Sequence, residues 1–223
     1  MTRQSNGINK AGLDRVTEPI FEGMNMNIVD RAKNILLTPA SEWAVIAAET
    51  TSVQALFTRY AAILAALPLI GMVLFGAVLG MGMPIGVMAV VTMAVVTYVV
   101  GLTLLLVIGL IVNAVAPSFG GKSDMTQTMK LLVYSSTPTW LAALVSPIPF
   151  IGWLLALAAI VYAIYLVYLG VRPVMGVPDQ KAIGFTAVTV LIYFVISFVI
   201  MGTIIGTVTA SFMNAAMMRG AMM

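Results

Sequence analysis

Five long apolar segments with almost no charged residues constrain this chain more than any other feature of its sequence. A helix rises 1.5 Å per residue, so about 20 apolar residues cross the roughly 30 Å hydrocarbon core of a bilayer. The segments that meet this requirement are 60–80, 84–113, 130–147, 150–171 and 183–209. We therefore predict an all-α fold: a polytopic membrane protein whose five transmembrane helices form one bundle across residues 60–209.

Composition excludes several classes of function. Hydrophobic residues make up 61% of the chain and charged residues 9%, whereas soluble domains carry about a quarter charged residues. The sequence has no cysteine and no histidine, which removes the usual ligands of zinc, haem and iron–sulfur clusters. Ionisable residues are also missing well inside the five segments, which argues against intramembrane catalysis and proton-coupled transport. We predict no catalytic residue, no metal site, no cofactor and no enzymatic activity.

The net charge of +3 is small, and the basic residues are scattered along the chain. A nucleic-acid-binding surface requires a cluster of lysine and arginine on one face. We therefore predict the lipid bilayer as the main partner and no nucleic-acid partner.

The first 59 residues are more polar than the rest and divide into two parts. Residues 1–25 are predicted to be a flexible tail, because they lack the apolar run of a signal peptide. Residues 26–59 are predicted to form cytoplasmic amphipathic helices that lie on the membrane. An alternative is that their apolar face packs on the protein's own cytoplasmic surface. The candidate membrane-surface contacts are Ile28, Arg31, Ala32, Lys33, Ile35, Leu36 and Trp43.

Loop charges predict the orientation in the membrane. Two loops carry no charge, whereas the loops that alternate with them carry lysine or arginine. The positive-inside rule places the basic loops and the amino terminus in the cytoplasm, and the Met-rich carboxyl-terminal tail outside. We predict a multi-pass protein of the bacterial inner membrane. The predicted cytoplasmic segments are 1–59, 114–129 and 172–182, and the predicted outer segments are 81–83, 147–149 and 210–223.

A polar patch interrupts the third apolar segment. Polar groups at bilayer depth are costly unless a neighbouring helix or water pairs them, so the patch has three interpretations: a proline hinge, a helix-contact surface or the lining of a pore. Because proline removes a backbone hydrogen bond, we predict a kink or unwound turn within 133–139, facing other helices, with Trp140 close behind it. The patch residues are Tyr134, Ser135, Ser136, Thr137, Pro138 and Thr139.

Small residues and methionines form two further patterns. Glycine pairs at four-residue spacing let helices approach closely in lipid, which favours packing within the bundle, with a membrane-protein partner or homo-oligomer as the alternative. Methionine thioethers can hold Cu(I), but methionine is also an ordinary apolar filler. The glycines are Gly76, Gly80, Gly202 and Gly206, and the methionines are Met81, Met83, Met213, Met217, Met218, Met222 and Met223.

Four segments resemble bacterial members of the Yip (Rab/Ypt-interacting protein) family of membrane proteins. They lie at 35–49, 117–121, 134–142 and 162–182, the first beginning Ile35-Leu-Leu-Thr-Pro-Ala-Ser-Glu-Trp43. The resemblance extends over about residues 26–209 and implies a five-helix membrane domain with a cytoplasmic amino terminus.

The eukaryotic relatives of this family are associated with membrane trafficking, Rab-family GTPases and membrane shaping. This chain lacks their Asp-Leu-Tyr-Gly-Pro motif, and its nearest element is Tyr168-Leu-Gly170. The resemblance therefore does not extend to GTPase binding, and it implies no catalytic residue. The predicted function is a non-enzymatic membrane scaffold or organiser. The alternatives are a passive channel or small-solute carrier with a polar path at the third helix, and Cu(I) binding by methionines.

Overall fold

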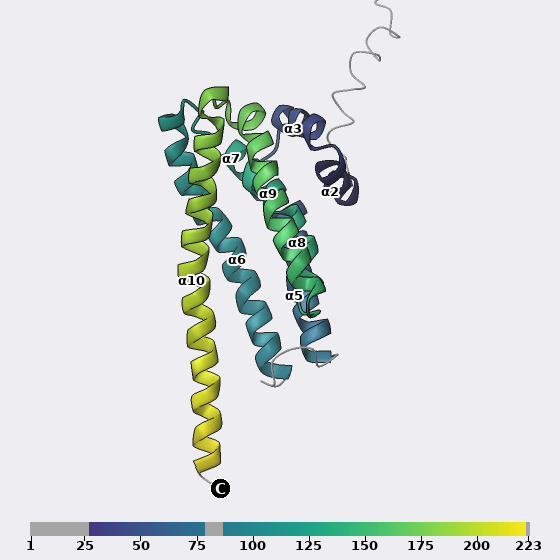
Figure 1. Ribbon diagram of the computed structural model, residues 1–223, viewed down its shortest axis with the longest axis vertical. Helices are drawn as coiled ribbons and strands as arrows, with labels where there is room; N and C mark the ends of the chain where they lie inside the picture. The colour runs from purple at the N-terminus through teal and green to yellow at the C-terminus, as the bar shows by residue number, and fades with distance from the viewer. Residues whose placement is uncertain (1–26, 79–86, 222–223) are drawn as a thin grey trace, which may run out of the picture.

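The computed structural model describes residues 27–78 and 87–221, and every regular element in those ranges is a helix (Figure 1). The prediction of an all-α fold is confirmed for this part of the chain. The tail predicted at residues 1–25 lies outside the described residues. The helices are α2 (Ile28–Leu37), α3 (Pro39–Ala48), α4 (Val53–Leu56), η2 (Phe57–Ala61), α5 (Ala62–Gly71), η3 (Met72–Val78), α6 (Val87–Val115), η4 (Ala116–Phe119), α7 (Met125–Ser135), α8 (Thr137–Ala143), α9 (Ile151–Met175) and α10 (Asp179–Ala221).

Within the described residues, four helical stretches are long and apolar enough to cross a membrane. They run Val53–Gly76, Val87–Phe119, Ile151–Met175 and Asp179–Ser211, with mean hydropathies from 1.8 to 2.8. These stretches match four of the five predicted spans. The fifth, at 130–147, is not one continuous helix: α7 ends at Ser135, and α8 begins at Thr137 and ends at Ala143. The structure therefore supports a multi-pass helical protein with four membrane-capable helices.

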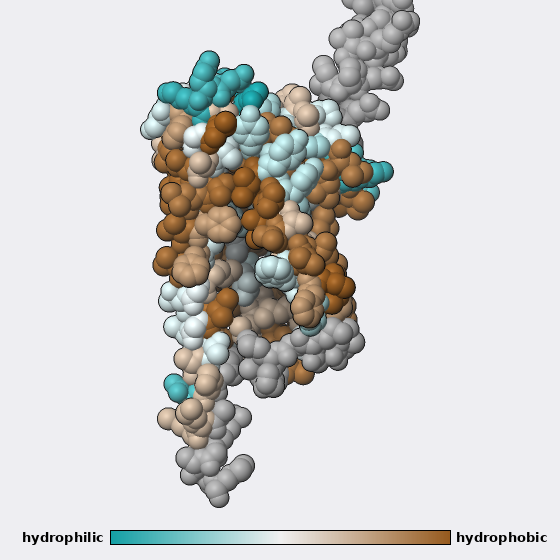
Figure 2. Space-filling view, in the orientation of Figure 1, coloured by the Kyte–Doolittle hydropathy of each residue, from teal (hydrophilic) through white to brown (hydrophobic). Residues whose placement is uncertain are grey.

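One end of the molecule gathers the polar segments. The helix pair α2 and α3, which we call the helical cap, lies there with the α6–α7 and α9–α10 connections (Figure 1). The Lys122 amide donates to the Met175 carbonyl at 2.9 Å and joins the two connections. Gly120 and Gly176 end η4 and α9 with φ of 78° and 67°, a left-handed conformation that glycine adopts without strain. Figure 2 shows hydrophilic surface at this end and a hydrophobic belt beyond it.

The main core lies where α3, α7 and α9 meet beneath this end. Trp43, Leu131 and Leu166 have no exposed surface there and belong to one buried cluster. By contrast, the far half of α10 leaves the bundle, and the helix continues to Ala221 through residues predicted to form a separate Met-rich tail. The described bundle is therefore tightest near the cap and opens toward the opposite end.

Close helix contacts occur at glycines other than the predicted pairs. A Cβ on Gly170 would stand 2.7 Å from Leu131 Cδ1 and 2.8 Å from Trp43 Cε2, so glycine is required where α9 meets α7 and α3. A Cβ on Gly71 would overlap the backbone of Leu144, and the Leu144 carbonyl oxygen would be the atom nearest to it. Of the predicted glycines, Gly76 makes one ordinary contact, Gly202 and Gly206 have no atom within 4 Å of a Cβ, and Gly80 lies outside the described residues.

Candidate functional site

A buried charge network fixes the helical cap on the membrane bundle. Arg31 on α2 forms ion pairs with Glu42 on α3 and with Glu49, the residue that ends α3. The Arg31 and Glu42 side chains are each 6% exposed, and that of Glu49 is 17% exposed. Burial raises the pKa of Glu49, and the positive charge of Arg31 opposes this shift. The Arg31 guanidinium also lies 5.6 Å from the centre of the Tyr134 ring on α7.

Lys130 completes this network from the membrane side. Its ammonium donates to the carbonyls of Ile46 and Glu49 at 2.8 and 2.6 Å, and the residue is 1% exposed. Gln127, one turn earlier on α7, donates to the Ala47 carbonyl at 3.2 Å. The last carbonyls of a helix lack partners within that helix and carry partial negative charge. Lys130 and Gln127 therefore cap the carboxyl end of α3 and attach it to α7.

A column of aromatic and hydroxyl groups continues from the network into the bundle. The ring of Tyr134 makes edge contacts with Trp43 on α3 and with Tyr60 on η2, at centroid distances of 6.5 and 4.7 Å. The Tyr60 hydroxyl is 2.8 Å from Thr137 Oγ1 on α8. The cap is therefore connected through buried side chains to the residues that surround the break between α7 and α8.

The break occurs at Ser136, within the range predicted for a kink. Pro138 lies in the first turn of α8, where its missing N–H would have had no helical partner. Ser136 and Thr139 hydroxyls donate to the carbonyls of Leu132 and Ser136, at 2.8 and 2.7 Å. All residues from Tyr134 to Pro138 are buried, and Trp140 follows half-buried. Local hydroxyl bonds thus satisfy carbonyls near the interruption, and the patch faces other helices.

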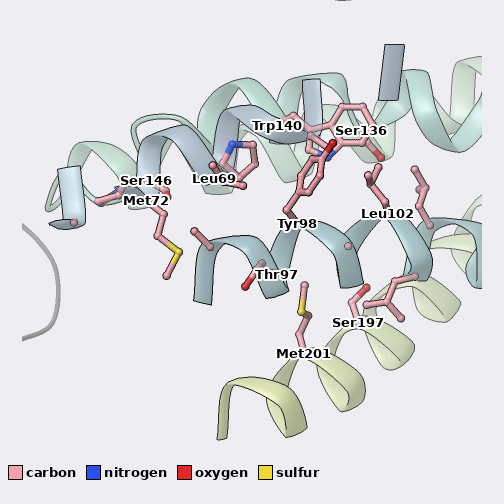
Figure 3. A pocket seen from close by; sticks show the side chains of 18 of the residues that line it. Leu69, Met72, Thr97, Tyr98, Leu102, Ser136, Trp140, Ser146, Ser197 and Met201 are labelled. Carbon is pink, nitrogen blue, oxygen red and sulfur yellow. The ribbon is translucent and has the colours of Figure 1, made fainter. Parts of the chain in front are cut away.

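Two cavities adjoin this break. The larger, of about 890 Å³, lies between α5, α6, α8 and α10. Figure 2 shows a hollow in the surface beside α10, on the side that faces α8 and α9. Figure 3 shows Tyr98 extending from α6 toward Ser136 and Trp140, with Ser197 and Met201 of α10 on the opposite wall. The smaller, of about 270 Å³, lies between α7, α8, α9 and α10. Ser136 and Tyr193 line both cavities, so the two adjoin each other.

Two residues that line the small cavity have buried hydroxyls without hydrogen-bond partners. Ser135 Oγ on α7 and Thr189 Oγ1 on α10 belong to residues 3% and 2% exposed. Leaving such a group unpaired costs about 1–3 kcal/mol, so most buried hydroxyls are paired. After a rotation of the side chain toward the cavity, either hydroxyl can donate to or accept from a molecule there. Sequence reasoning found Ser135 as part of the patch but missed Thr189, which stands in an uninterrupted apolar helix.

The predicted membrane contacts in the cap require a correction. Trp43 and Ile35 have no exposed surface, and Arg31 is 5% exposed. Ile28, Ala32 and Leu36 are partly buried against the same core, so the predicted membrane face packs on the protein itself. Lys33 alone among the predicted contacts is exposed. A buried cluster and an ion-pair network therefore cover the face of α2 and α3 that these residues form.

The described residues contain no group of three or more histidine, cysteine, aspartate or glutamate side chains that could hold a metal. Met213, Met217 and Met218 are exposed on α10. The other methionines of the Cu(I) alternative, Met81, Met83, Met222 and Met223, lie outside the described residues.

The sequence of this chain matches the model of the Yip1 domain over residues 33–218. This chain belongs to the Yip1 domain family. The match begins within α2 and ends within α10, and therefore includes the carboxyl end of α3, the break at Ser136 and both cavities. It confirms the family inferred from the four sequence segments. No match was found among curated proteins or among solved structures.

Proposed function

We propose that this Yip1 domain protein is a non-enzymatic organiser of the bacterial inner membrane, in which α2 acts as a fixed wedge at the membrane interface. The observation that carries this proposal is the position of α2 along the long axis of the helix bundle. The Tyr162 hydroxyl, near the middle of the membrane-capable helix α9, donates to the Leu36 carbonyl at 2.6 Å. Figure 1 shows α2 beside α8 and α9, farther into the bundle than α3. This position beside the membrane-capable helices supports contact between α2 and lipid.

The outward side of α2 has the chemistry of an interfacial helix. Val29, Lys33 and Leu37 follow one another at four-residue spacing, which places them in one stripe. Val29 is 65% exposed and Leu37 68% exposed. Apolar side chains of this kind enter the acyl boundary, while a lysine between them extends its ammonium to the headgroups. Because the buried network holds α2 at a fixed depth, the stripe would expand one leaflet only and so favour curvature.

The cytoplasmic orientation of the cap is part of this proposal. Arg31, Lys33, Lys122, Arg172 and Lys181 all belong to the polar end of the molecule. The positive-inside rule therefore favours a cytoplasmic cap and a carboxyl terminus on the other side. Topology reporters fused after Lys122 and after Met223 are expected to report opposite compartments. Equal compartments would contradict this orientation.

The wedge is tested by changing Val29 and Leu37 together to serine in the full-length protein. Each change lowers the favourable free energy of transferring the side chain from water into lipid by about 1–2 kcal/mol. The buried face of α2 stays intact. We expect liposomes reconstituted with the wild type to become smaller or tubular by cryo-electron microscopy, and the double variant to lose most of this effect. Val45→Ser is the matched control, since Val45 is 40% exposed on α3.

The depth of α2 is measured separately in the same liposomes. Since the chain has no native cysteine, single cysteines at 29, 37 and 45 can carry a fluorophore. Nitroxide lipids labelled near the headgroup should quench the fluorophore at 29 and 37 more strongly than at 45. Equal quenching at all three, or liposomes that the double variant reshapes as strongly as the wild type, would refute the wedge.

A further inference from the structure

The small cavity has features that no part of the membrane-organising proposal uses. The described residues contain four buried side-chain polar atoms without a hydrogen-bond partner, and two of them, Ser135 Oγ and Thr189 Oγ1, belong to residues that line this one cavity. They come from α7 and α10, and four apolar residues of α9 complete the wall: Ile160, Ala163, Ile164 and Val167. Two unpaired hydroxyls among apolar side chains are costly to bury for packing alone. A ligand that hydrogen-bonds to both would remove that cost.

The lining identifies the chemical class of the ligand. No residue that lines the small cavity in the described chain carries a charge. A phosphate or carboxylate would be buried there without a counter-charge, which is strongly unfavourable. A neutral carbonyl or hydroxyl group, by contrast, can accept from or donate to both Ser135 and Thr189. The remaining walls are mostly apolar and suit a hydrocarbon chain better than a water-filled path.

The residues around the small cavity provide an entry route from the bilayer, and the neighbouring larger cavity provides space for an apolar chain. Tyr193 and Phe194 border the small cavity, are 39% and 47% exposed, and belong to the membrane-capable helix α10. A molecule dissolved in the bilayer therefore reaches the cavity from the lipid side. Tyr193 also lines the cavity of about 890 Å³, which falls in the range of ordinary ligand sites and can hold the apolar remainder of the molecule.

We propose that this protein binds a neutral, lipid-soluble molecule with a carbonyl or hydroxyl group, which hydrogen-bonds to Ser135 and Thr189 while its apolar chain extends past Tyr193 into the larger cavity. The site lies beside the break at Ser136, and the column from Tyr134 to Thr137 connects that break to the helical cap. The binding site is independent of the wedge on α2.

The test uses the full chain in phosphatidylethanolamine–phosphatidylglycerol nanodiscs and three photoactivatable probes of equal chain length. The probes are a long-chain alcohol with a diazirine near the hydroxyl, the matching hydrocarbon and the matching fatty acid. We expect the alcohol to label residues within 132–139 and 189–194, and the hydrocarbon and the acid to label them several-fold less. Changing Ser135 to alanine and Thr189 to valine together should reduce labelling about fivefold, since each lost neutral hydrogen bond weakens binding by a factor of a few.

Two controls separate binding from packing. Thr186 lies one turn earlier on α10, and its hydroxyl donates to the Ala182 carbonyl at 2.8 Å. The Thr186→Val variant should therefore leave labelling unchanged. Ala163→Leu fills the cavity from α9 and should abolish labelling. In protein without probe, the double variant should unfold at the same or a higher temperature, because it removes unpaired hydroxyls. Equal labelling by alcohol and hydrocarbon, labelling elsewhere, or undiminished labelling of the double variant would overturn the proposal.

Discussion

Replacing Arg31 with methionine is expected to destabilise the protein by about 3–5 kcal/mol. Methionine keeps much of the apolar stem but leaves the carboxylates of Glu42 and Glu49 buried without their cation. Removing one partner of a buried ion pair is far more damaging than losing an exposed pair. Reversible unfolding in mixed detergent micelles measures the change. Lys33→Met, on the exposed side of the same helix, is the control and should change stability by no more than about 0.5 kcal/mol.

The pH dependence of this variant follows from the same network. Burial already raises the pKa of Glu49 in the wild type, and loss of Arg31 raises it further. A carboxyl group with a raised pKa in the folded state stabilises the fold below its unfolded pKa, and this contribution is lost as the pH rises through the folded pKa. The Arg31→Met variant should therefore recover stability as the medium is acidified toward the ordinary pKa of a glutamate carboxyl group. Equal stability of the Arg31→Met and Lys33→Met variants at neutral pH would contradict the buried network.

Much of the fold could be predicted because apolar runs and proline determine the structure of the segment in which they stand. Four spans follow from length and hydropathy, and the break at Ser136 follows from the position of Pro138. The burial of Arg31 could not be predicted in this way. An amphipathic pattern shows that one face is covered but does not say whether lipid or protein covers it. Nor does the sequence pair Lys130 with the Ile46 carbonyl, 84 residues away.

The same distinction separates the two parts of the candidate site. The hydroxyls from Ser135 to Thr139 are conspicuous because they are adjacent in the sequence. Thr189 stands alone in an apolar helix, and only the packing of α10 beside α7 and α9 brings it to the same cavity as Ser135. The glycine pairs at four-residue spacing do not mark the tightest helix contacts of the described bundle, for a related reason. Four-residue spacing marks a face on which helices can meet, whereas the tight contact at Gly71 depends on which segment folds back against it.

Changing Gly71 to valine is the second substitution with a large expected effect, of about 3 kcal/mol or more. A Cβ at this position meets the carbonyl group of Leu144, which directly follows α8. A flexible side chain could rotate away, but backbone cannot, so α5 and the end of α8 must separate. Gly71→Ala should already destabilise the protein, because the clash begins at Cβ. In mixed micelles, the free energy of unfolding should be highest with glycine at position 71, lower with alanine and lowest with valine.

The matched control for Gly71 is Gly101, in the middle of α6, where a Cβ meets no atom within 4 Å. Alanine at Gly101 should therefore leave stability unchanged or raise it slightly, since glycine is the weaker helix former. The large cavity gives a second comparison, because Pro68 and Leu69, just before Gly71, form part of its wall. If α5 moves away from α8, the gap between the two helices should open. A cysteine introduced at position 69 should then react faster with a lipid-soluble thiol reagent. If Gly71→Ala matches Gly101→Ala in both stability and reactivity, α5 and α8 are not in backbone contact, and the cavity wall must be formed in another way.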